Sequence, residues 1–315
     1  PEYELSNEII FDKEYTPNGP NWYEGNKILQ FFAPVQFGGW EALSPTQDMV
    51  DAYECIDGLS IDESPLYDPA NPYENRDPRL AFSILWPGAQ YDVVYYDSEP
   101  MTLTFDNQSM GDGSHTRTGY TMRKYLDPNE FPFRRRTETN FIYIRYAEVL
   151  LNKAEAAYKL NKTDYKSLIN KIRNRAGIGD YTGNDWWTEY KTQRRIEFAF
   201  ECPGHRYFDL LRWGQADGLS VIKELNTASR GLWISRKGVE INEYGVGKLG
   251  YPADPTDPGY FVPTFKTYKV NKLNSNYDRI FDHLRYYFIP FNKTSFSGYD
   301  QIQQNPGWSN FNYND

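Results

Sequence analysis

With 315 residues, the chain is long enough to bury a sizeable core, and its formal net charge is −9 at neutral pH. This acidic balance excludes a basic nucleic-acid-binding surface and disfavours adhesion to an anionic membrane. Aromatic residues make up 17% of the chain, and Tyr and Trp are favoured where one ring edge stays in water, as at ligand platforms and interfaces.

Residues 1–140 are rich in Gly, Pro, Asn and Asp, and their apolar residues form short runs. Four runs predict short strands joined by long irregular loops, at 7–11, 80–86, 92–96 and 101–105. One stretch, "SPTQDMVDAYE", predicts a short helix, because Ser44 suits an N-cap and Pro45 suits the first helical position. The chain opens at Pro1 directly into the first strand, so we expect this start to come from processing or truncation.

From residue 141 to 214 the apolar spacing becomes helical. Apolar residues at i, i+3, i+4 and i+7 predict one helix that ends near Asn161 and a second that is capped by Thr163 and ends at Gly177. Together they span about 35 residues, close to the tetratricopeptide period. Because a lone repeat cannot bury its own face, neighbouring repeats are expected. Two further helices are predicted at 188–200 and 205–213.

The remaining residues, 215–315, are mostly loop. "YPADPTDPGYFVPTFKTYKV" predicts an ordered loop that leads into a strand, because its prolines exclude a helix. "RYYFIP" predicts a buried strand and "QIQQNPGW" a turn. We therefore divide one continuous domain into a ligand-binding region of loops and short strands (1–140), a helical tetratricopeptide-like region (141–214) and a loop-rich region that packs on the helices (215–315).

The segment "RRIEFAFECPGHRYFDLLRWG" raises the question of catalysis, because Glu197, Glu201, His205 and Asp209 recur every four residues. Two carboxylates held across a bond can hydrolyse a glycoside. However, Pro203 interrupts the helix, and arginines near the acids would lower their pKa values below those of a general acid. No nucleophile motif accompanies them. We interpret the segment as a strut of structural ion pairs and expect no catalytic residue.

No metal or cofactor is expected. The two cysteines, Cys55 and Cys202, show no zinc-binding spacing, and whether they pair stays open. The loop "DNQSMGDG" places Met110 where a calcium-binding loop needs a ligand, and the three histidines are isolated in sequence. No run of about 18 apolar residues predicts a membrane-spanning helix.

Six ordered motifs resemble the SusD/RagB family of outer-membrane nutrient-binding lipoproteins, from about residue 7 to 308. They are "LSPTQDMVDAYECIDG", "YDPANPYENRDPRL", "NFIYIRYAEVLLNKAEAAY", "LINKIRNRAGI", "RRIEFAF…GHRYFDLLRWG" and "QNPGW". The resemblance implies a mostly α fold with extensive irregular loops and short strands, in which tetratricopeptide-type helix pairs support a loop-rich binding subdomain. Two departures stand out: Cys202-Pro203 extends the family's Phe-Glu-Gly-His step, and the family's N-terminal half, with its lipidation cysteine, is absent.

The resemblance also implies a non-catalytic function at the extracellular face of the outer membrane. Such a protein captures oligosaccharide or polysaccharide and delivers it to a SusC-type TonB-dependent transporter, and its contact with the membrane is a lipid anchor in the absent N-terminal part. A RagB-like receptor for peptides or protein fragments is the alternative, which the aromatic excess disfavours. A glycoside hydrolase and a tetratricopeptide-type adaptor are the remaining alternatives.

Candidate ligand-binding residues are rings on Gly- and Pro-bounded loops, because flat rings match the apolar faces of sugars and loops carry function. They are Trp22, Tyr23, Trp40, Tyr67, Tyr73, Trp86 and Tyr91. We expect Trp40, with Tyr67 or Trp86, to carry binding, because the glycines of "QFGGWEALSP" let the backbone approach a ligand closely. Three other tryptophans are assigned to the core: Trp213, Trp233 and Trp308.

Overall fold

The computed structural model describes residues 6–15, 25–94, 99–105, 116, 118–130, 137–201, 205–217, 224–225, 230–235 and 264–269. Trp22, Tyr23 and Cys202 lie outside these ranges, as do the expected strand at 285–290 and the expected turn with Trp308. The chain divides into two compact units, one of Pro1–Pro203 with Ser229–Val270 and the other of Gly204–Ala228 with Asn271–Asp315. Helix α7 (His205–Asp217) belongs to the second unit, and the elements that follow belong to the first.

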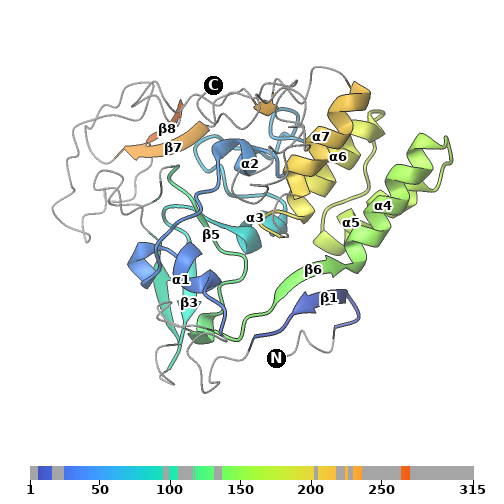
Figure 1. Cartoon of the computed structure of the whole chain (residues 1–315). Helices are drawn as coiled ribbons and strands as arrows, with labels where there is room; N and C mark the ends of the chain where they lie inside the picture. The colour runs from blue at the N-terminus through green and yellow to red at the C-terminus, as the bar shows by residue number, and fades with distance from the viewer. Residues whose placement is uncertain are drawn as a thin grey trace, which may run out of the picture. The chain divides into compact units, whose positions relative to one another are not determined.

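Three long helices pack against one another, α4 (Tyr146–Lys159), α5 (Tyr165–Ala176) and α6 (Trp186–Glu197) (Figure 1). The first two confirm the predicted helix pair, and Gly177 ends the second in the left-handed conformation, with φ of 87°. The cap prediction was wrong, because Asp164, not Thr163, precedes α5 and its side chain makes no capping bond. Helix α6 begins two residues earlier than predicted, because the Asp185 carboxylate accepts the Thr188 amide at 3.0 Å.

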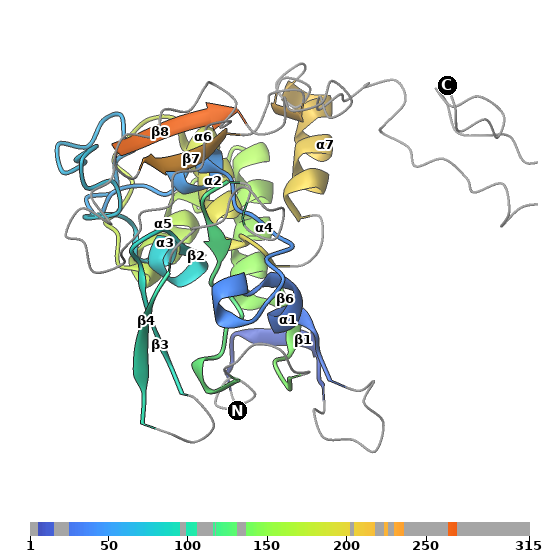
Figure 2. The ribbon, with the colours of Figure 1, turned by 90° about the vertical axis from the view of Figure 1, so that its left-hand side faces the viewer.

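The strands form four antiparallel pairs (Figures 1 and 2). The pairs are β1 (Ile9–Lys13) with β6 (Phe141–Arg145), β2 (Ile84–Leu85) with β5 (Thr121–Met122), β3 (Gln90–Val93) with β4 (Met101–Thr104), and β7 (Arg230–Ser235) with β8 (Thr264–Lys269). Strand β8 confirms the strand predicted after the Pro-rich loop. Figure 2 shows β3 and β4 as a ribbon of neighbouring strands.

The N-terminal region contains more helix than predicted: α1 (Ile28–Phe32), the 3₁₀ turn η2 (Val35–Phe37), α2 (Gln47–Asp51) and α3 (Pro78–Ser83). Helix α3 replaces most of the strand predicted at 80–86. The Asp77 carboxylate accepts the Arg79 amide at 2.9 Å and Pro78 occupies the first turn, so capping overrides the apolar run. In α2 the cap is Thr46 rather than Ser44, since the Thr46 hydroxyl accepts the Met49 amide at 3.2 Å.

Among the described residues, two apolar clusters support the N-terminal loops. The first holds Leu29, Ala33, Phe37, Leu85, Ala89, Tyr91, Val93, Phe105 and Leu126. The second holds Val50, Tyr53, Leu80, Ile84, Tyr120 and Ile196, and it ties α6 to the N-terminal region. The fold is thus mostly helical with short strands and long irregular loops, as predicted. Within the described part of the chain, no helix is long and apolar enough to cross a bilayer.

Candidate ligand-binding site

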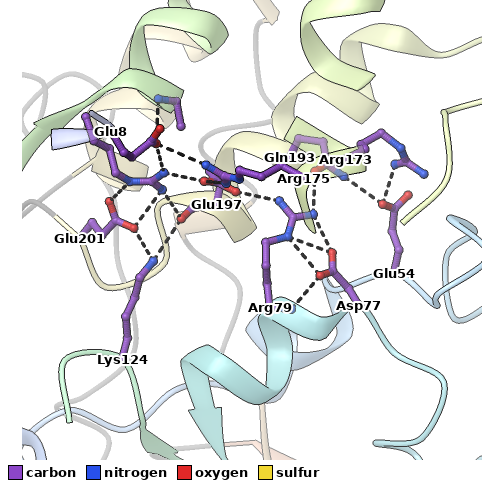
Figure 3. A network of polar contacts seen from close by, with 12 residues as sticks. Glu8, Glu54, Asp77, Arg79, Lys124, Arg173, Arg175, Gln193, Glu197 and Glu201 are labelled. Atoms are coloured by element: carbon purple, nitrogen blue, oxygen red, sulfur yellow. Dashed lines mark hydrogen bonds and ion pairs between the residues drawn. The ribbon is translucent and has the colours of Figure 1, made fainter. Parts of the chain in front are cut away.

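The acidic cluster at the end of α6 is a buried ion-pair network (Figure 3). Glu197 accepts from Arg145 Nη1 at 2.6 Å and also from Arg175. Its other oxygen accepts from Arg79 Nη1 at 2.9 Å. Glu201 accepts two hydrogen bonds from Arg145, at 2.6 and 3.0 Å, and a third from Lys124. The two acids therefore join α6 to α3, α5 and β6.

These contacts support the interpretation of the segment as a strut of structural ion pairs, and they show which arginines bind Glu197. Three partners of Glu197, namely Arg79, Arg145 and Arg175, come from other elements than the motif itself. Burial alone would raise the pKa of Glu197, but attraction to Arg145, Arg175 and Arg79 lowers it to about 2. A carboxylate held ionised in this way cannot act as a general acid near neutral pH. The four-residue spacing also divides between elements, because His205 and Asp209 lie on α7.

Trp40 lies in a loop whose backbone is fixed by α1 and the turn after it. The amides of Trp40, Glu41 and Ala42 donate to the carbonyls of Gln30, Ala33 and Phe31 at 2.8, 3.0 and 2.8 Å. Despite this fixed backbone, the Trp40 side chain is 54% exposed. An exposed ring on a rigid backbone loses little conformational freedom when a ligand stacks on it. Such an arrangement suits a binding platform.

Phe31 is a second ring at this position, and it is not among the residues predicted from the sequence. Its centroid lies 4.9 Å from that of Trp40, with the two ring planes at 90°, and Phe31 is 39% exposed. Phe31 lies on α1, a helix too short for its periodicity to show in the sequence. Trp40 and Phe31 therefore form an exposed pair of perpendicular rings in the first unit.

A second aromatic pair forms between two other predicted residues. Tyr73 and Trp86 stack with centroids 4.5 Å apart and planes at 16°, and both are half-buried. Trp86 packs against both apolar clusters, so part of its ring serves the core. Tyr67 is half-buried, and the Arg76 guanidinium lies 5.6 Å from its ring centroid. Trp40 therefore stands out as the most exposed ring among the predicted residues that the structure describes.

Tyr91 is placed in the core. It is 4% exposed, it stacks on Phe37 at 5.9 Å, and its hydroxyl donates to the Leu126 carbonyl at 2.7 Å. A ring buried in this way offers no face to a ligand, which argues against the binding role predicted for Tyr91. Trp213 is buried, as expected. Among the described residues, no group of His, Cys, Asp and Glu could hold a metal ion, and Cys55 is a free buried thiol.

The sequence model of the SusD family matches residues 7–308. The chain belongs to the SusD family. Its fold agrees, because a SusD-like protein from Bacteroides fragilis superposes with a TM-score of 0.70 at 25% identity, over 98% of this chain and 55% of its own. A SusD-like carbohydrate binding protein from the same species superposes with a TM-score of 0.57 at 27% identity, over 72% of this chain and 44% of its own.

Surface glycan-binding protein A from Bacteroides uniformis shares the SusD-like fold, with a TM-score of 0.50 at 19% identity over 96% of this chain and 50% of its own. The chain thus spans about half the length of these SusD-like proteins. The curated proteins contain no match.

Proposed function

We propose that the protein binds oligosaccharide or polysaccharide through Trp40 and does not hydrolyse it. The observation that carries this proposal is the exposed Trp40 ring on a backbone held by three consecutive hydrogen bonds. An indole face matches the apolar C–H face of a sugar ring, and Phe31 adds a second surface at right angles to it. A SusD-like relative described as carbohydrate binding supports the same ligand class.

Membership of the SusD family supports the wider setting. We propose that the protein works at the extracellular face of the outer membrane, with a lipid anchor in the N-terminal part of the full protein. There it delivers captured glycan to a SusC-type TonB-dependent transporter. The roles of Tyr67, Tyr73 and Trp86 are proposed as secondary, since each is half-buried.

Affinity electrophoresis tests the ligand. The protein runs in native gels that contain starch, xylan, β-glucan, galactomannan or pectin, beside a peptide-library pull-down. We expect retardation by at least one polysaccharide and no enrichment of peptides. Trp40→Ala should weaken binding roughly tenfold, because a stacked ring contributes about 1–3 kcal/mol when it carries an interface.

Trp187→Ala is the matched control. Trp187 is half-buried and stacks between Tyr158 and Tyr190, both at 5.2 Å, while Lys159 Nζ lies 3.9 Å from its centroid. Its loss should lower stability and leave affinity unchanged. Trp40→Ala with unchanged affinity would place the platform elsewhere, and enrichment of peptides without gel retardation would favour the peptide receptor.

A further inference from the structure

Glu41 follows the exposed Trp40 directly, yet it is buried, with 7% of its surface exposed. Its backbone is left-handed, with φ of 50°, a conformation that costs a non-glycine residue on the order of 1 kcal/mol. The Glu41 amide donates to the Ala33 carbonyl at 3.0 Å. The buried Glu41 side chain therefore lies directly beside an exposed ring in the sequence.

Among the residues that the structure describes, the groups that face the Glu41 carboxyl are neutral. Oε2 accepts a hydrogen bond from the Thr116 amide at 2.9 Å. Oε1 has no hydrogen-bond partner among the described residues. The other polar groups that face it are the Val35 amide and the Thr121 hydroxyl, and none of these groups titrates. Burial raises the pKa of Glu41 to about 7, against the opposing hydrogen bond from Thr116.

The contact with Thr116 connects Glu41 to the buried residue Tyr120. The Thr116 hydroxyl donates to the Tyr120 carbonyl. At the other end of Tyr120, its hydroxyl donates to Gln47 Oε1 at 2.5 Å and contacts the Tyr73 hydroxyl at 3.2 Å, and Tyr73 stacks on Trp86. Glu41 thus lies between the exposed Trp40 loop and Tyr120, the residue that contacts the Tyr73–Trp86 pair.

We propose that Glu41 is a positioning residue that holds the Trp40 loop against the end of α1, and that ligand capture through Trp40 weakens as the pH rises past neutrality. The loop is called closed when it is packed against α1 in this way and open when it is released to water. The ligand part of this inference rests on the proposed function. A neutral Glu41 fits its apolar and uncharged surroundings. An ionised Glu41 carries a buried charge with one oxygen unsatisfied, which favours opening of the loop to water.

The sign follows from the direction of the shift. A carboxyl whose pKa is higher in the closed loop than in the open loop supports the closed form fully below its ordinary pKa, near 4.5. This support is lost as the pH rises through about 7. Raising the pH from 6 to 8 should therefore make the closed form of the loop less stable, and its amides should be less protected from hydrogen exchange.

Hydrogen exchange of the loop tests this without any ligand. Exchange of peptides covering residues 28–42 is measured at pH 6 and pH 8 and corrected for the intrinsic rate. In the wild type we expect protection of the Trp40, Glu41 and Ala42 amides to fall about three- to tenfold at pH 8, by the linkage of one titrating group. Glu41→Gln, which keeps an acceptor for Thr116 and has no charge, should show equal protection at both pH values.

Glu54→Gln is the matched control, because burial and the nearby Glu189 carboxylate also raise the pKa of Glu54 to about 7, while its carboxylate bonds to Arg173 and not to the Trp40 loop. The Glu54→Gln variant should keep the pH dependence of the loop. If the wild-type loop is equally protected at both pH values, or if Glu54→Gln removes the effect, the proposal is overturned.

The affinity arm uses the polysaccharide most strongly retained in the gels, measured by titration calorimetry at pH 6 and pH 8. Wild-type affinity should fall about three- to tenfold at pH 8, Glu41→Gln should bind equally at both, and Glu41→Ala should bind weakly at both. If no polysaccharide binds, the proposed function fails while the exchange result still decides the role of Glu41. A pH-independent affinity with Glu41→Ala unchanged would remove Glu41 from the site.

Discussion

At the scale of single residues, Gly39 shows how the exposed loop depends on a missing side chain. A Cβ atom built at Gly39 would lie 2.2 Å from the Ala33 carbonyl oxygen and 2.7 Å from the Ala33 Cβ. The same Ala33 carbonyl accepts the Glu41 amide. The loop therefore packs against the end of α1 backbone to backbone, and Gly38, with φ of 94°, allows the turn that brings it there.

Gly39→Ala should destabilise the protein by about 1–3 kcal/mol, because a backbone carbonyl cannot move aside as a flexible side chain can. Binding through Trp40 should weaken as well. Gly179→Ala is the control, since nothing lies within 4 Å of its added methyl; it should be neutral or stabilise by about 0.4–1 kcal/mol through the unfolded chain. Urea unfolding of both variants measures the difference, and equal stabilities would show that the loop shifts freely.

At the scale of elements, the end of α6 is fixed by charge rather than by apolar packing alone. Three arginines from α3, β6 and α5 converge on Glu197, and the apolar Ile196 beside it joins the second core cluster. A similar arrangement holds the start of α6, where the fully buried Arg173 of α5 contacts Glu54 and Glu189. Buried pairs of this kind fix the positions of elements, because a misplaced helix leaves an uncompensated charge.

Glu197→Gln should destabilise the protein by about 3–5 kcal/mol at pH 6, since the largely buried guanidinium groups of Arg79 and Arg145 lose the anion that they share with the exposed Arg175. The pKa of Glu197 is lowered to about 2, so its stabilising effect is present above about 4.5 and is lost as the pH falls toward 2. Urea unfolding from pH 2.5 to 6 should show the two proteins converging at the acid end. Lys153→Ala, which removes an exposed contact with Asp164 at 3.9 Å, should change stability by less than about 0.5 kcal/mol.

At the scale of the whole molecule, the carboxyl groups with shifted pKa values in the described part of the chain do not form the pair that glycoside hydrolysis requires. That reaction needs a raised and a lowered pKa on two acids that flank one bond. Glu41 has a raised pKa, but no second carboxylate among the described residues shifts it. Glu54 has a raised pKa, and burial raises that of its neighbour Glu189 as well. Glu197 has a lowered pKa and is enclosed by arginines.

We therefore expect that incubation with any polysaccharide the protein binds leaves the length of that polysaccharide unchanged over days. A reducing-end assay and size-exclusion chromatography of the polysaccharide provide the measurement, with boiled protein as the blank. Release of reducing ends that copurifies with the protein and disappears in Glu41→Gln would establish a hydrolase instead.

The sequence alone predicted the features that depend on local patterns. The periodicity of α4 and α5, the stop at Gly177 and the strand after the Pro-rich loop needed no tertiary information, because helix propagation and prolines act over a few residues. Six ordered motifs were enough to indicate the family. The short helices α1 and α3 were not predicted, because five or six residues show too little helical periodicity to be distinguished from an apolar run.

Tertiary structure alone decided which side chains meet. Glu197 and Arg145 lie 52 residues apart, and no pattern in the sequence around either residue predicts that they pair. Trp40 and Tyr91 looked alike as loop aromatics, yet one ring is exposed and the other is buried against Phe37. Burial is set by what the rest of the chain places around a residue, and a ring near glycines or prolines has the same local sequence signal in either case.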